Sequence, residues 1–445
     1  MDIRRFGLCF KGFFSARGLR STGQPELITA IRHQPCNQVQ AVRMQLEWPD
    51  NPQQVQSMSP GQAASSNPQP VNGAHDPASV ILAHDYLIQM GGAERLFASM
   101  HRAWPGAPVY ASATDHDHLL PDFRDAEIHN TWMQRLPGLR KHHKKLFPVY
   151  PFAFKSFGRL DADAAVVSSS GFSKWLRFTP RTRVFCYCHT PPRFFWQTEH
   201  YLKNEVQSKV LKAFARLFVM WLRPSDYACA KKVHHFIANS NNVKNRIREF
   251  YGRDSVVIYP PVEVHKFRVT PRHDGYYLIL SRLVSYKGID RAVAAFLKNG
   301  RRLVVAGGGP DRARLEQLAG GAGNIEFRGR VEDAEAIKLI ENCRAFVLPG
   351  SEDFGITPLE AQAAGKPVLA FGDGGALETV VDGETGVLFT DSTPDGINAA
   401  VARLESISWD PDRIRRHAER FAEPNFIAAM QNYVREQMAA PPPNL

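Results

Sequence analysis

The chain has 445 residues and a formal net charge of +11, with 44% hydrophobic and 22% charged residues. The length indicates two or three domains, and the composition excludes a fibrous or wholly disordered chain. No run of about 18 apolar residues occurs, which excludes a conventional spanning helix, and six cysteines are too few for a disulfide scaffold, so reduced thiols in a cytosolic setting are the simpler interpretation.

The basic excess lies in the middle of the chain. Residues 80–262 have a net charge of +12, whereas residues 1–79 have +2 and residues 263–445 have −3. Such asymmetry indicates a polyanionic partner, either nucleic acid or an anionic membrane, for one domain only. The alternative is a basic domain that is merely soluble.

Residues 1–78 differ in composition from the rest. Residues 1–23 are rich in Arg and poor in acids, as in an organellar transit peptide, and residues 50–77 are dominated by Gln, Asn, Pro and Ser. The second stretch cannot bury a core, so we expect disorder. Met44 and Met58 lie within this region, and a start codon assigned too far upstream is an equal alternative to targeting.

A regular pattern begins at Val80. The apolar run 80–84 precedes a Gly-Gly turn and a segment with apolar residues at helical spacing (93–104). Further short strands are predicted at Ala164–Ser168, Val184–Tyr187 and His235–Ala238. Strands that alternate with helices predict an α/β protein with parallel sheets covered on both faces.

A second set of strands follows Pro260-Pro261. These strands are predicted at 276–283, 302–309, 324–329, 345–351 and 367–372. Two sets separated by a Pro-Pro hinge predict two Rossmann-like domains that face a cleft, with ligands at the carboxyl ends of the strands. The predicted parts are an N-terminal extension (1–78), a first domain (79–262), a second domain (263–420) and a C-terminal segment (421–445), whose helix is expected to cross back to the first domain although Pro424 breaks its pattern.

The most informative passage is residues 351–389. Glu352 follows a predicted strand, and Pro358 and Glu360 suit the first turn of a helix. The amides of the residues between them (Phe354, Gly355 and Ile356) are then free to bind an anion or a hydroxyl-rich ligand. By spacing alone, Glu360 could equally serve only to stabilise the helix dipole.

Glu352 and Glu360, separated by seven residues, resemble the E-x7-E motif of family 4 glycosyltransferases, which are retaining enzymes of the GT-B fold. The resemblance extends over residues 80–440 and is strongest to bacterial mannosyltransferases of lipid-linked glycan and O-antigen synthesis. It implies that Glu352 and the amides of Phe354, Gly355 and Ile356 bind the donor sugar. It also implies that Glu360 binds the ribose.

Two further passages of the second domain resemble this family. Arg282 and Lys287 stand where a helix begins and suit a diphosphate. Taken alone, such a pair is usually only solvated, but the resemblance implies that it neutralises the diphosphate leaving group in place of a metal ion. Residues 327–333 resemble the segment that meets the nucleotide base, through the backbone near Val331.

Two passages of the first domain add to the resemblance. Gly91 and Gly92 alone indicate only a turn, but they resemble the family's glycine loop that faces the donor. His189 corresponds to a His beside the donor sugar. The nearby Cys186 and Cys188 suggest buried packing rather than a metal site. Gln197 departs from the Asp that the mannosyltransferases tend to have there.

Residues 131–159 combine aromatic side chains with a basic cluster (Arg140, Lys141, Lys144, Lys145). This mixture suits an anionic membrane surface, although a single-stranded nucleic-acid groove uses the same residue types. Related transferases act on lipid-linked acceptors, which favours the membrane. Residues 211–223 form a second amphipathic stretch, expected to pack on the protein's own core.

The resemblance therefore implies a metal-independent, retaining hexosyltransferase. Its donor is expected to be GDP-mannose, its acceptor a lipid-linked glycan of cell-surface polysaccharide synthesis, and its location the cytoplasm, peripherally at the inner face of the membrane. Alternatives are a nucleotide-sugar epimerase or hydrolase of the same fold and a basic nucleic-acid-binding protein. The motifs of the second domain have no purpose in nucleic-acid binding, so no nucleic-acid partner is expected.

Overall fold

The computed structural model describes residues 79–89, 91–139, 143–199 and 209–443. The chain divides into two compact units, Met1–Gln69 and Pro70–Leu445, and all described residues belong to the second unit. The predicted extension 1–78 lies outside the described residues, as do Arg140 and Lys141 of the predicted basic cluster. The predictions made for these residues are therefore untested.

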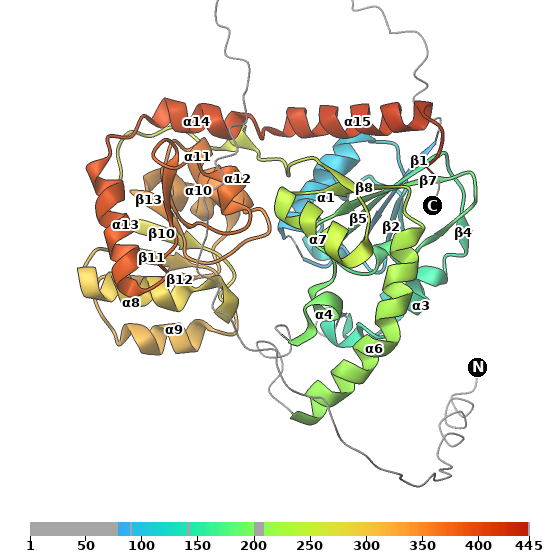
Figure 1. Ribbon diagram of the computed structural model, residues 1–445, viewed down its shortest axis with the longest axis horizontal. Coiled ribbons are helices and arrows are strands. Elements are labelled where there is room, and N and C mark those ends of the chain that lie inside the picture. The colour runs from blue at the N-terminus through green and yellow to red at the C-terminus, as the bar shows by residue number, and fades with distance from the viewer. Residues whose placement is uncertain (1–78, 90, 140–142, 200–208, 444–445) are drawn as a thin grey trace, which may run out of the picture. The chain divides into compact units, whose positions relative to one another are not determined.

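The strands of the first half of the unit form a seven-stranded parallel sheet (Figure 1). Its order is β3-β2-β1-β5-β7-β8-β9. The central strands β5 and β7 are buried apart from Arg183, the first residue of β7, because the rest of their sequences is apolar or small, as expected for a sheet covered on both faces. The bounds are β1 (Val80–His84), β2 (Val109–Ala111), β3 (Ile128–Asn130), β5 (Ala164–Ser169), β7 (Arg183–Cys188), β8 (His235–Ala238) and β9 (Ser255–Val257), with a separate pair β4 (Arg159–Leu160) and β6 (Arg177–Phe178).

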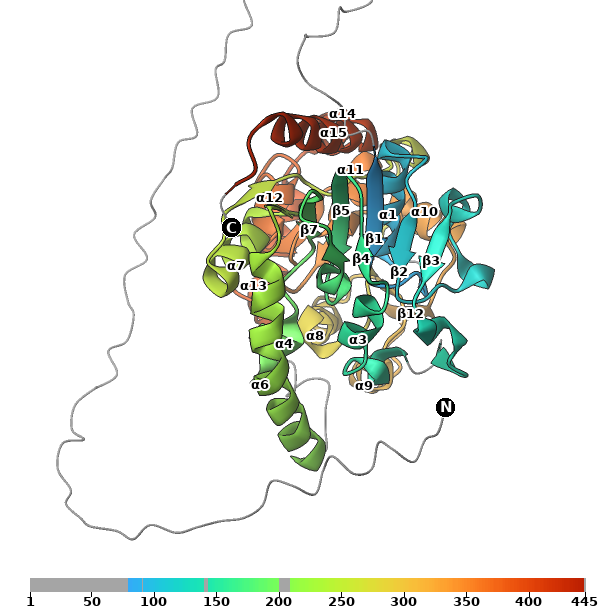
Figure 2. The ribbon, with the colours of Figure 1, turned by 90° about the vertical axis from the view of Figure 1, so that its right-hand side faces the viewer.

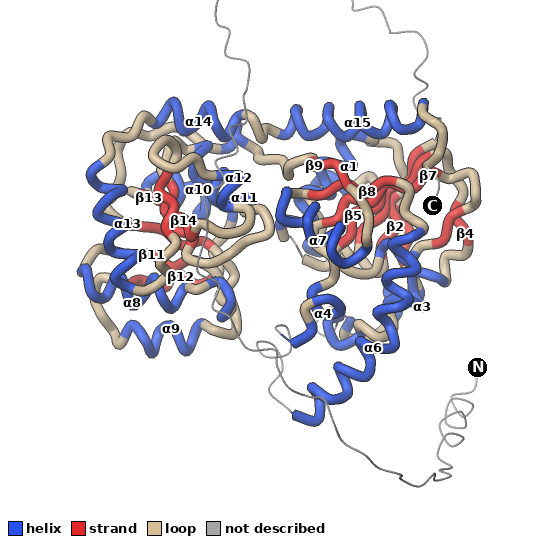
Figure 3. The backbone as a smooth tube through the Cα atoms, in the orientation of Figure 1, coloured by secondary structure: helices blue, strands red, loops and turns tan. Residues whose placement is uncertain are grey.

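The second half forms a six-stranded parallel sheet of order β12-β11-β10-β13-β14-β15. Figure 3 shows the two sheets as separate groups of strands, each flanked by helices. The α/β prediction with two parallel sheets is therefore confirmed. The bounds are β10 (Tyr277–Leu280), β11 (Leu303–Ala306), β12 (Ile325–Gly329), β13 (Ala345–Leu348), β14 (Val368–Phe371) and β15 (Gly386–Phe389).

The helices begin and end where local chemistry allows. For example, the Ser240 Oγ accepts a hydrogen bond from the Val243 amide at the start of α7, and Gly252 ends that helix in the left-handed conformation. The helices near the first sheet are α1 (Gly92–Ala103), α3 (Tyr150–Lys155), α4 (Arg193–Trp196), α6 (Lys209–Lys231) and α7 (Asn241–Tyr251). Those that follow are α8 (Ile289–Asn299), α9 (Arg312–Ala319), α10 (Asp333–Asn342), α11 (Ile356–Ala363), α12 (Ala376–Thr379), α13 (Pro394–Ser406), α14 (Pro411–Glu419) and α15 (Glu423–Ala439).

The C-terminal helices connect the two halves. Helix α14 packs against α11, and α15 packs against α1, where Phe426, Met430 and Val434 join the core of the first sheet. The expectation that Pro424 breaks a helix is wrong, because this residue lies in the first turn of α15, where its missing N–H has no partner to lose.

Helix α6 also differs from the expectation. Only part of it packs on the core, through residues such as Val219 and Leu222. Four large apolar side chains are exposed by 61–67% (Phe214, Leu217, Met220, Trp221). Figure 2 shows the first turns of α6 extending beyond the sheet. The described residues contain no helix long and apolar enough to cross a membrane.

Candidate functional site

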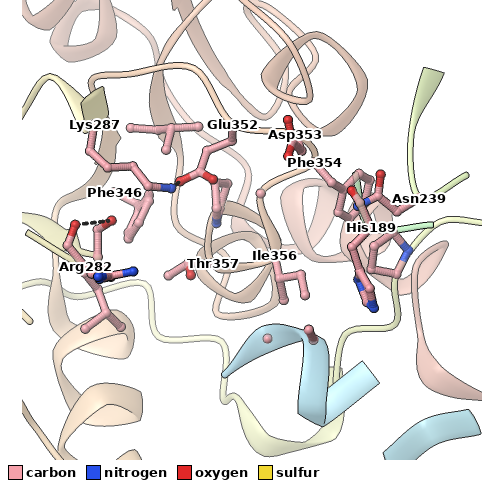
Figure 4. Close-up of a pocket in the computed structure, with 18 of the residues that line it drawn as sticks. His189, Asn239, Arg282, Lys287, Phe346, Glu352, Asp353, Phe354, Ile356 and Thr357 are labelled. Atoms are coloured by element: carbon pink, nitrogen blue, oxygen red, sulfur yellow. Dashed lines mark hydrogen bonds and ion pairs between the residues drawn. The ribbon is translucent and has the colours of Figure 1, made fainter. Parts of the chain in front are cut away.

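A cavity of about 430 Å³ lies between the carboxyl ends of the two sheets. Its wall includes the start of α1 and the loop after β7 from the first sheet, and the loops after β10 and β13 from the second. Figure 4 shows Lys287, Glu352 and Arg282 on one side and His189 and Asn239 on the other. This volume falls in the range of small-molecule sites, and the position is where α/β sheets bind ligands.

The structure brings most of the predicted site residues to this cavity. Eight of them line it: Gly92, His189, Arg282, Lys287, Glu352, Phe354, Gly355 and Ile356. Val331 and Glu360 are not part of its wall. Val331 is half-buried against the core of the second sheet, and Glu360 projects from α11.

The loops that carry Lys287 and Glu352 touch through their glycines. Gly288 has a φ of 66°, and a Cβ placed there would lie 2.8 Å from the Pro349 carbonyl oxygen. A Cβ at Gly350 would in turn collide with the Lys287 carbonyl. Glycine is therefore required at both positions for the backbones to approach, and this approach sets Lys287 opposite Glu352.

Lys287 Nζ and the Glu352 carboxylate form an ion pair that faces the cavity, with side chains 14% and 23% exposed. Arg282 stands nearby and, among the described residues, has no carboxylate within ion-pair distance. The cavity therefore offers one unneutralised cation and one cation that an incoming anion can draw from its carboxylate.

Helix α11 begins at the cavity wall. Its N-cap, Gly355, has a φ of 90°, a conformation open to glycine but strained for other residues. The amides of Ile356 and Thr357 are then at a helix N-terminus, where partial positive charge favours an anion or hydroxyl oxygen. The sequence predicted that Glu360 lies in the first turn of this helix. In the structure it is the fifth residue, just after the first turn.

Burial raises the pKa of Glu360 to about 7, although the positive charge of Arg95 opposes this shift. The carboxylate also senses Asp333 and Glu263, which raise its pKa further. Arg95 from α1 donates to both carboxylate oxygens of Asp333 at 2.7 and 2.8 Å. Glu360 therefore lies near Asp333, two residues beyond Val331.

Asp353 is a cavity residue that the sequence analysis did not single out. Its carboxylate accepts a hydrogen bond from Arg193 Nη2 at 2.7 Å and is also paired with Arg246. Arg246 in addition donates to Thr190 Oγ1 at 3.2 Å. Both arginines follow strands of the first sheet, so Asp353 ties the Glu352 loop to the His189 loop. The signal in the sequence that could have indicated Asp353 is its position as an acidic residue directly after Glu352.

His189 is half-buried in the cavity wall. Asn239, which follows β8 and was also missed, donates from Nδ2 to the His189 carbonyl at 3.0 Å. Cys186 and Cys188 belong to the core, and burial raises the pKa of both thiols. Within the described residues, no group of three or more His, Cys, Asp or Glu side chains could hold a metal ion.

Comparison with known families identifies the class. Residues 90–266 match the family described as Glycosyltransferase Family 4, and residues 263–421 match Glycosyl transferases group 1. The chain belongs to the family 4 glycosyltransferases of the GT-B fold, which confirms the resemblance seen in the motifs.

Individual proteins support this assignment. A GDP-mannose-dependent α-(1-6)-phosphatidylinositol monomannoside mannosyltransferase of Mycobacterium tuberculosis is 33% identical over 195 residues, which are 37% of this chain and 51% of the relative. The α-1,3/1,6-mannosyltransferase ALG2 of Dictyostelium discoideum is 26% identical over 49% of this chain and 61% of its own. The chain thus spans little more than half the length of curated relatives that it matches (50–61% for three of them).

The fold is also that of a solved structure, Anabaena HepE in complex with UDP and glucose. That likeness has a TM-score of 0.60 and 18% identity, and it covers 80% of this chain and 100% of the other. At this identity it supports the fold and nothing finer.

Proposed function

We propose that the protein is a metal-independent, retaining glycosyltransferase that transfers mannose from GDP-mannose to a lipid-linked glycan in cell-surface polysaccharide synthesis. The observation that carries this proposal is the cavity itself. It gathers Arg282, Lys287, Glu352 and the N-terminus of α11 around a space of small-molecule size. Cations for a diphosphate and a carboxylate for hydroxyl groups are the recognition chemistry of a nucleotide sugar.

The ion pair between Lys287 and Glu352 is central to the proposed mechanism. The donor diphosphate draws Lys287 toward itself, and Glu352 then accepts hydrogen bonds from hydroxyl groups of the sugar. Arg282 adds a second cation beside the phosphates. As the bond from the sugar to the diphosphate breaks, negative charge grows on the leaving group, and Lys287 and Arg282 stabilise it more strongly than in the ground state. The departing phosphate takes the proton of the acceptor hydroxyl on the same face of the sugar.

The nucleoside is assigned to the region beside the cavity. Glu360 is proposed to bind the ribose hydroxyl groups, and the backbone near Val331 to contact the base. The electrostatic interaction of Glu360 with Asp333 supports placing Glu360 near Val331, because Asp333 is the first residue of α10 and stands two positions after Val331. The amides of Phe354, Gly355 and Ile356 are assigned to the sugar and the phosphate nearest to it, with Gly92 facing them from α1.

The choice of donor and acceptor rests on the relatives. The Mycobacterium tuberculosis protein is GDP-mannose-dependent by name and acts on a phosphatidylinositol monomannoside. We propose by analogy that the donor of this chain also carries guanosine and mannose, and that its acceptor is also attached to a lipid. The four described cysteines are free thiols, as suits the reducing cytoplasm in which we place the protein.

Helix α6 is the proposed contact with the membrane. Phe214, Leu217 and Trp221 recur at helical spacing and are each exposed by 61–66%. They form an exposed apolar stripe, which the likewise exposed Phe152 of α3 extends by stacking with Trp221. Lys212 and Arg216 lie on the same turns. Exposed apolar groups flanked by cations suit the interface of an anionic membrane. The protein would thus attach peripherally to the inner face, near its lipid-borne acceptor.

Thermal stabilisation by nucleotides tests the donor. A ligand that binds only the folded protein raises its Tm according to its affinity, so GDP should raise the Tm more than UDP or ADP at equal concentration. Lys287→Ala should reduce the shifts with all three nucleotides, because they share the diphosphate, and Lys298→Ala, which removes an exposed lysine of α8, should retain the wild-type shifts. Equal shifts with all three nucleotides would contradict a guanine nucleotide as the donor.

A transfer assay tests the reaction. GDP-mannose labelled in the sugar should label a lipid extract that contains mannosylated glycolipids, with the α configuration preserved in the product. Incubation without lipid should release little free mannose. Release of free sugar at the same rate without an acceptor would instead identify a hydrolase.

A further inference from the structure

Tyr286 and Arg193 stand beside the cavity, where loops of the two sheets meet. Tyr286 directly precedes Lys287, and Arg193 is the first residue of α4. The Arg193 guanidinium lies 5.6 Å from the centroid of the Tyr286 ring, and its Nη2 donates to the Asp353 carboxylate at 2.7 Å. Because Lys287 and Asp353 both line the cavity, this pair lies at the cavity's edge.

The pair has binding groups that its own contacts do not use. Tyr286 is 36% exposed, and the Arg193 side chain is 31% exposed. Among the described residues, the Tyr286 hydroxyl and the Nε and Nη1 of Arg193 have no hydrogen-bond partner. Lys287 Nζ also lies 5.6 Å from the ring centroid, but groups in direct contact are about 3.5–4 Å apart. Neither cation therefore covers the ring.

These free groups suit a sugar. An aromatic ring packs against the apolar C–H face of a sugar ring, and the tyrosine hydroxyl adds a polar group at its edge. A guanidinium presents several N–H donors in a fixed plane, and these can bind the oxygens of neighbouring hydroxyl groups.

The stereochemistry of transfer places the acceptor at this edge. In a retaining reaction the acceptor hydroxyl approaches the face of the donor sugar from which the diphosphate leaves, and the proposed mechanism sets Lys287 beside that diphosphate. The acceptor must therefore occupy space next to Lys287 that the donor leaves free. Tyr286 is the chain neighbour of Lys287 and is not part of the cavity wall, so a donor in the cavity leaves its ring accessible.

Helix α4 also connects the pair to the proposed membrane contact. Arg223 of α6 donates from Nε to the Phe195 carbonyl at 2.9 Å, and Trp196 Nε1 donates to Asp226 of α6 at 2.9 Å. A glycan bound at Arg193 would lie on the element that packs against α6, which is where its lipid is expected.

We propose that Tyr286 and Arg193 form the subsite for the terminal sugar of the acceptor. The Tyr286 ring packs against the sugar ring, and the free N–H groups of Arg193 donate to its hydroxyl groups. This inference rests on the proposed function for the stereochemistry of transfer and for the glycan nature of the acceptor.

Saturation-transfer NMR with the full-length protein measures this contact directly. The probe is methyl α-mannopyranoside, and GDP-2-deoxy-2-fluoromannose, a donor analogue that reacts slowly, fills the cavity. The wild type should transfer saturation to the ring protons of the probe. Tyr286→Leu should weaken binding of the probe about tenfold, and Tyr286→Phe, which keeps the ring, should weaken it far less.

Tyr227→Leu is the matched control. Tyr227 of α6 is also 36% exposed, and the Lys231 ammonium lies 4.9 Å from its ring centroid, so this variant should bind the probe as the wild type does. Arg193→Lys keeps a cation for Asp353 but loses the planar set of donors. It should keep the wild-type Tm and raise the KM for the glycolipid acceptor. The Tm shift with GDP should stay unchanged in Tyr286→Leu and in Arg193→Lys.

The outcomes separate this inference from the proposed function. Equal binding of the probe by Tyr286→Leu and the wild type would overturn the inference. Loss of the GDP-induced Tm shift in Tyr286→Leu would also overturn it, because the ring would then be a nucleotide contact. Binding of the probe that depends on Tyr286, in a protein that transfers no sugar, would support the subsite and overturn the proposed function. If Tyr286→Leu does not fold, Arg193→Lys provides the comparison, and wild-type affinity for the probe in that variant would overturn the inference.

Discussion

Replacing Lys287 by alanine removes the cation that the mechanism sets beside the leaving group. A unit charge about 4 Å from a phosphate oxygen contributes about 4 kcal/mol at the effective dielectric of a partly exposed site. The Lys287 side chain is only 14% exposed, but solvent that enters the vacated space recovers part of this energy. A net loss of about 3–4 kcal/mol corresponds to a fall in kcat of about 10²- to 10³-fold.

The assay compares Lys287→Ala with two controls. Lys287→Arg keeps a cation and should lose far less activity, although its planar group cannot reproduce the geometry of an ammonium group. Lys298→Ala removes a 60% exposed lysine whose partner is the surface residue Asp395, and it should behave as wild type. Initial rates with labelled GDP-mannose give kcat and KM, and circular dichroism checks that each variant is folded.

The pattern of the kinetic constants is diagnostic. A cation that acts on the developing charge lowers kcat, whereas one that only binds the donor raises KM. Glu352→Gln combined with Lys287→Ala should cost less than the sum of the two single changes, because each residue is the other's partner in the unliganded cavity. A folded Lys287→Ala protein with near-normal kcat would refute the proposed mechanism.

Four further predictions concern Glu360, Asp353 and helix α6. Glu360→Ala should weaken GDP binding in calorimetry by about 10-fold if the carboxylate holds the ribose, and an unchanged Kd would contradict that role. The pKa of Glu360 is about 7 in the folded protein and 4.5 in the unfolded chain, so between these pH values the folded state keeps a proton that the unfolded state releases. The free energy of unfolding should therefore decrease as the pH rises from 4.5 to 7. Glu360→Gln should make this decrease smaller when the free energy is measured by urea titration at each pH. Asp353→Asn should separate the two cavity loops and lower the Tm by a few degrees, because it leaves two arginines unpaired; a wild-type Tm and KM would show that the tie is dispensable. The double variant Leu217→Glu/Trp221→Glu should bind vesicles that contain phosphatidylglycerol at least tenfold more weakly than the wild type. Leu377 of α12 is comparably exposed, and the control variant Leu377→Glu should bind as the wild type does. Equal binding by the two variants would exclude α6 as the membrane contact.

The sequence predicted the general architecture because the signals for it are local. Continuous apolar runs such as 80–84 and 164–168 marked buried parallel strands, and the motifs containing Arg282, Lys287, Glu352 and Glu360 identified the family. The short strands β2, β3 and β9 have three residues each and gave no such signal. Their pairing depends on neighbours that are distant in the chain, so no local pattern could reveal them.

The tertiary structure alone decided how these residues combine. Lys287 and Glu352 are 65 positions apart, and they meet only because Gly288 and Gly350 let two backbones touch. The link from Asp353 to Arg193 and Arg246 and the contact of Arg193 with Tyr286 likewise depend on contacts between loops. Helix α6 shows the same limit, because an amphipathic sequence cannot specify whether its apolar side meets the core or the solvent. Periodicity and motif chemistry are local properties of the chain, whereas each of these contacts is fixed by packing between segments far apart in it.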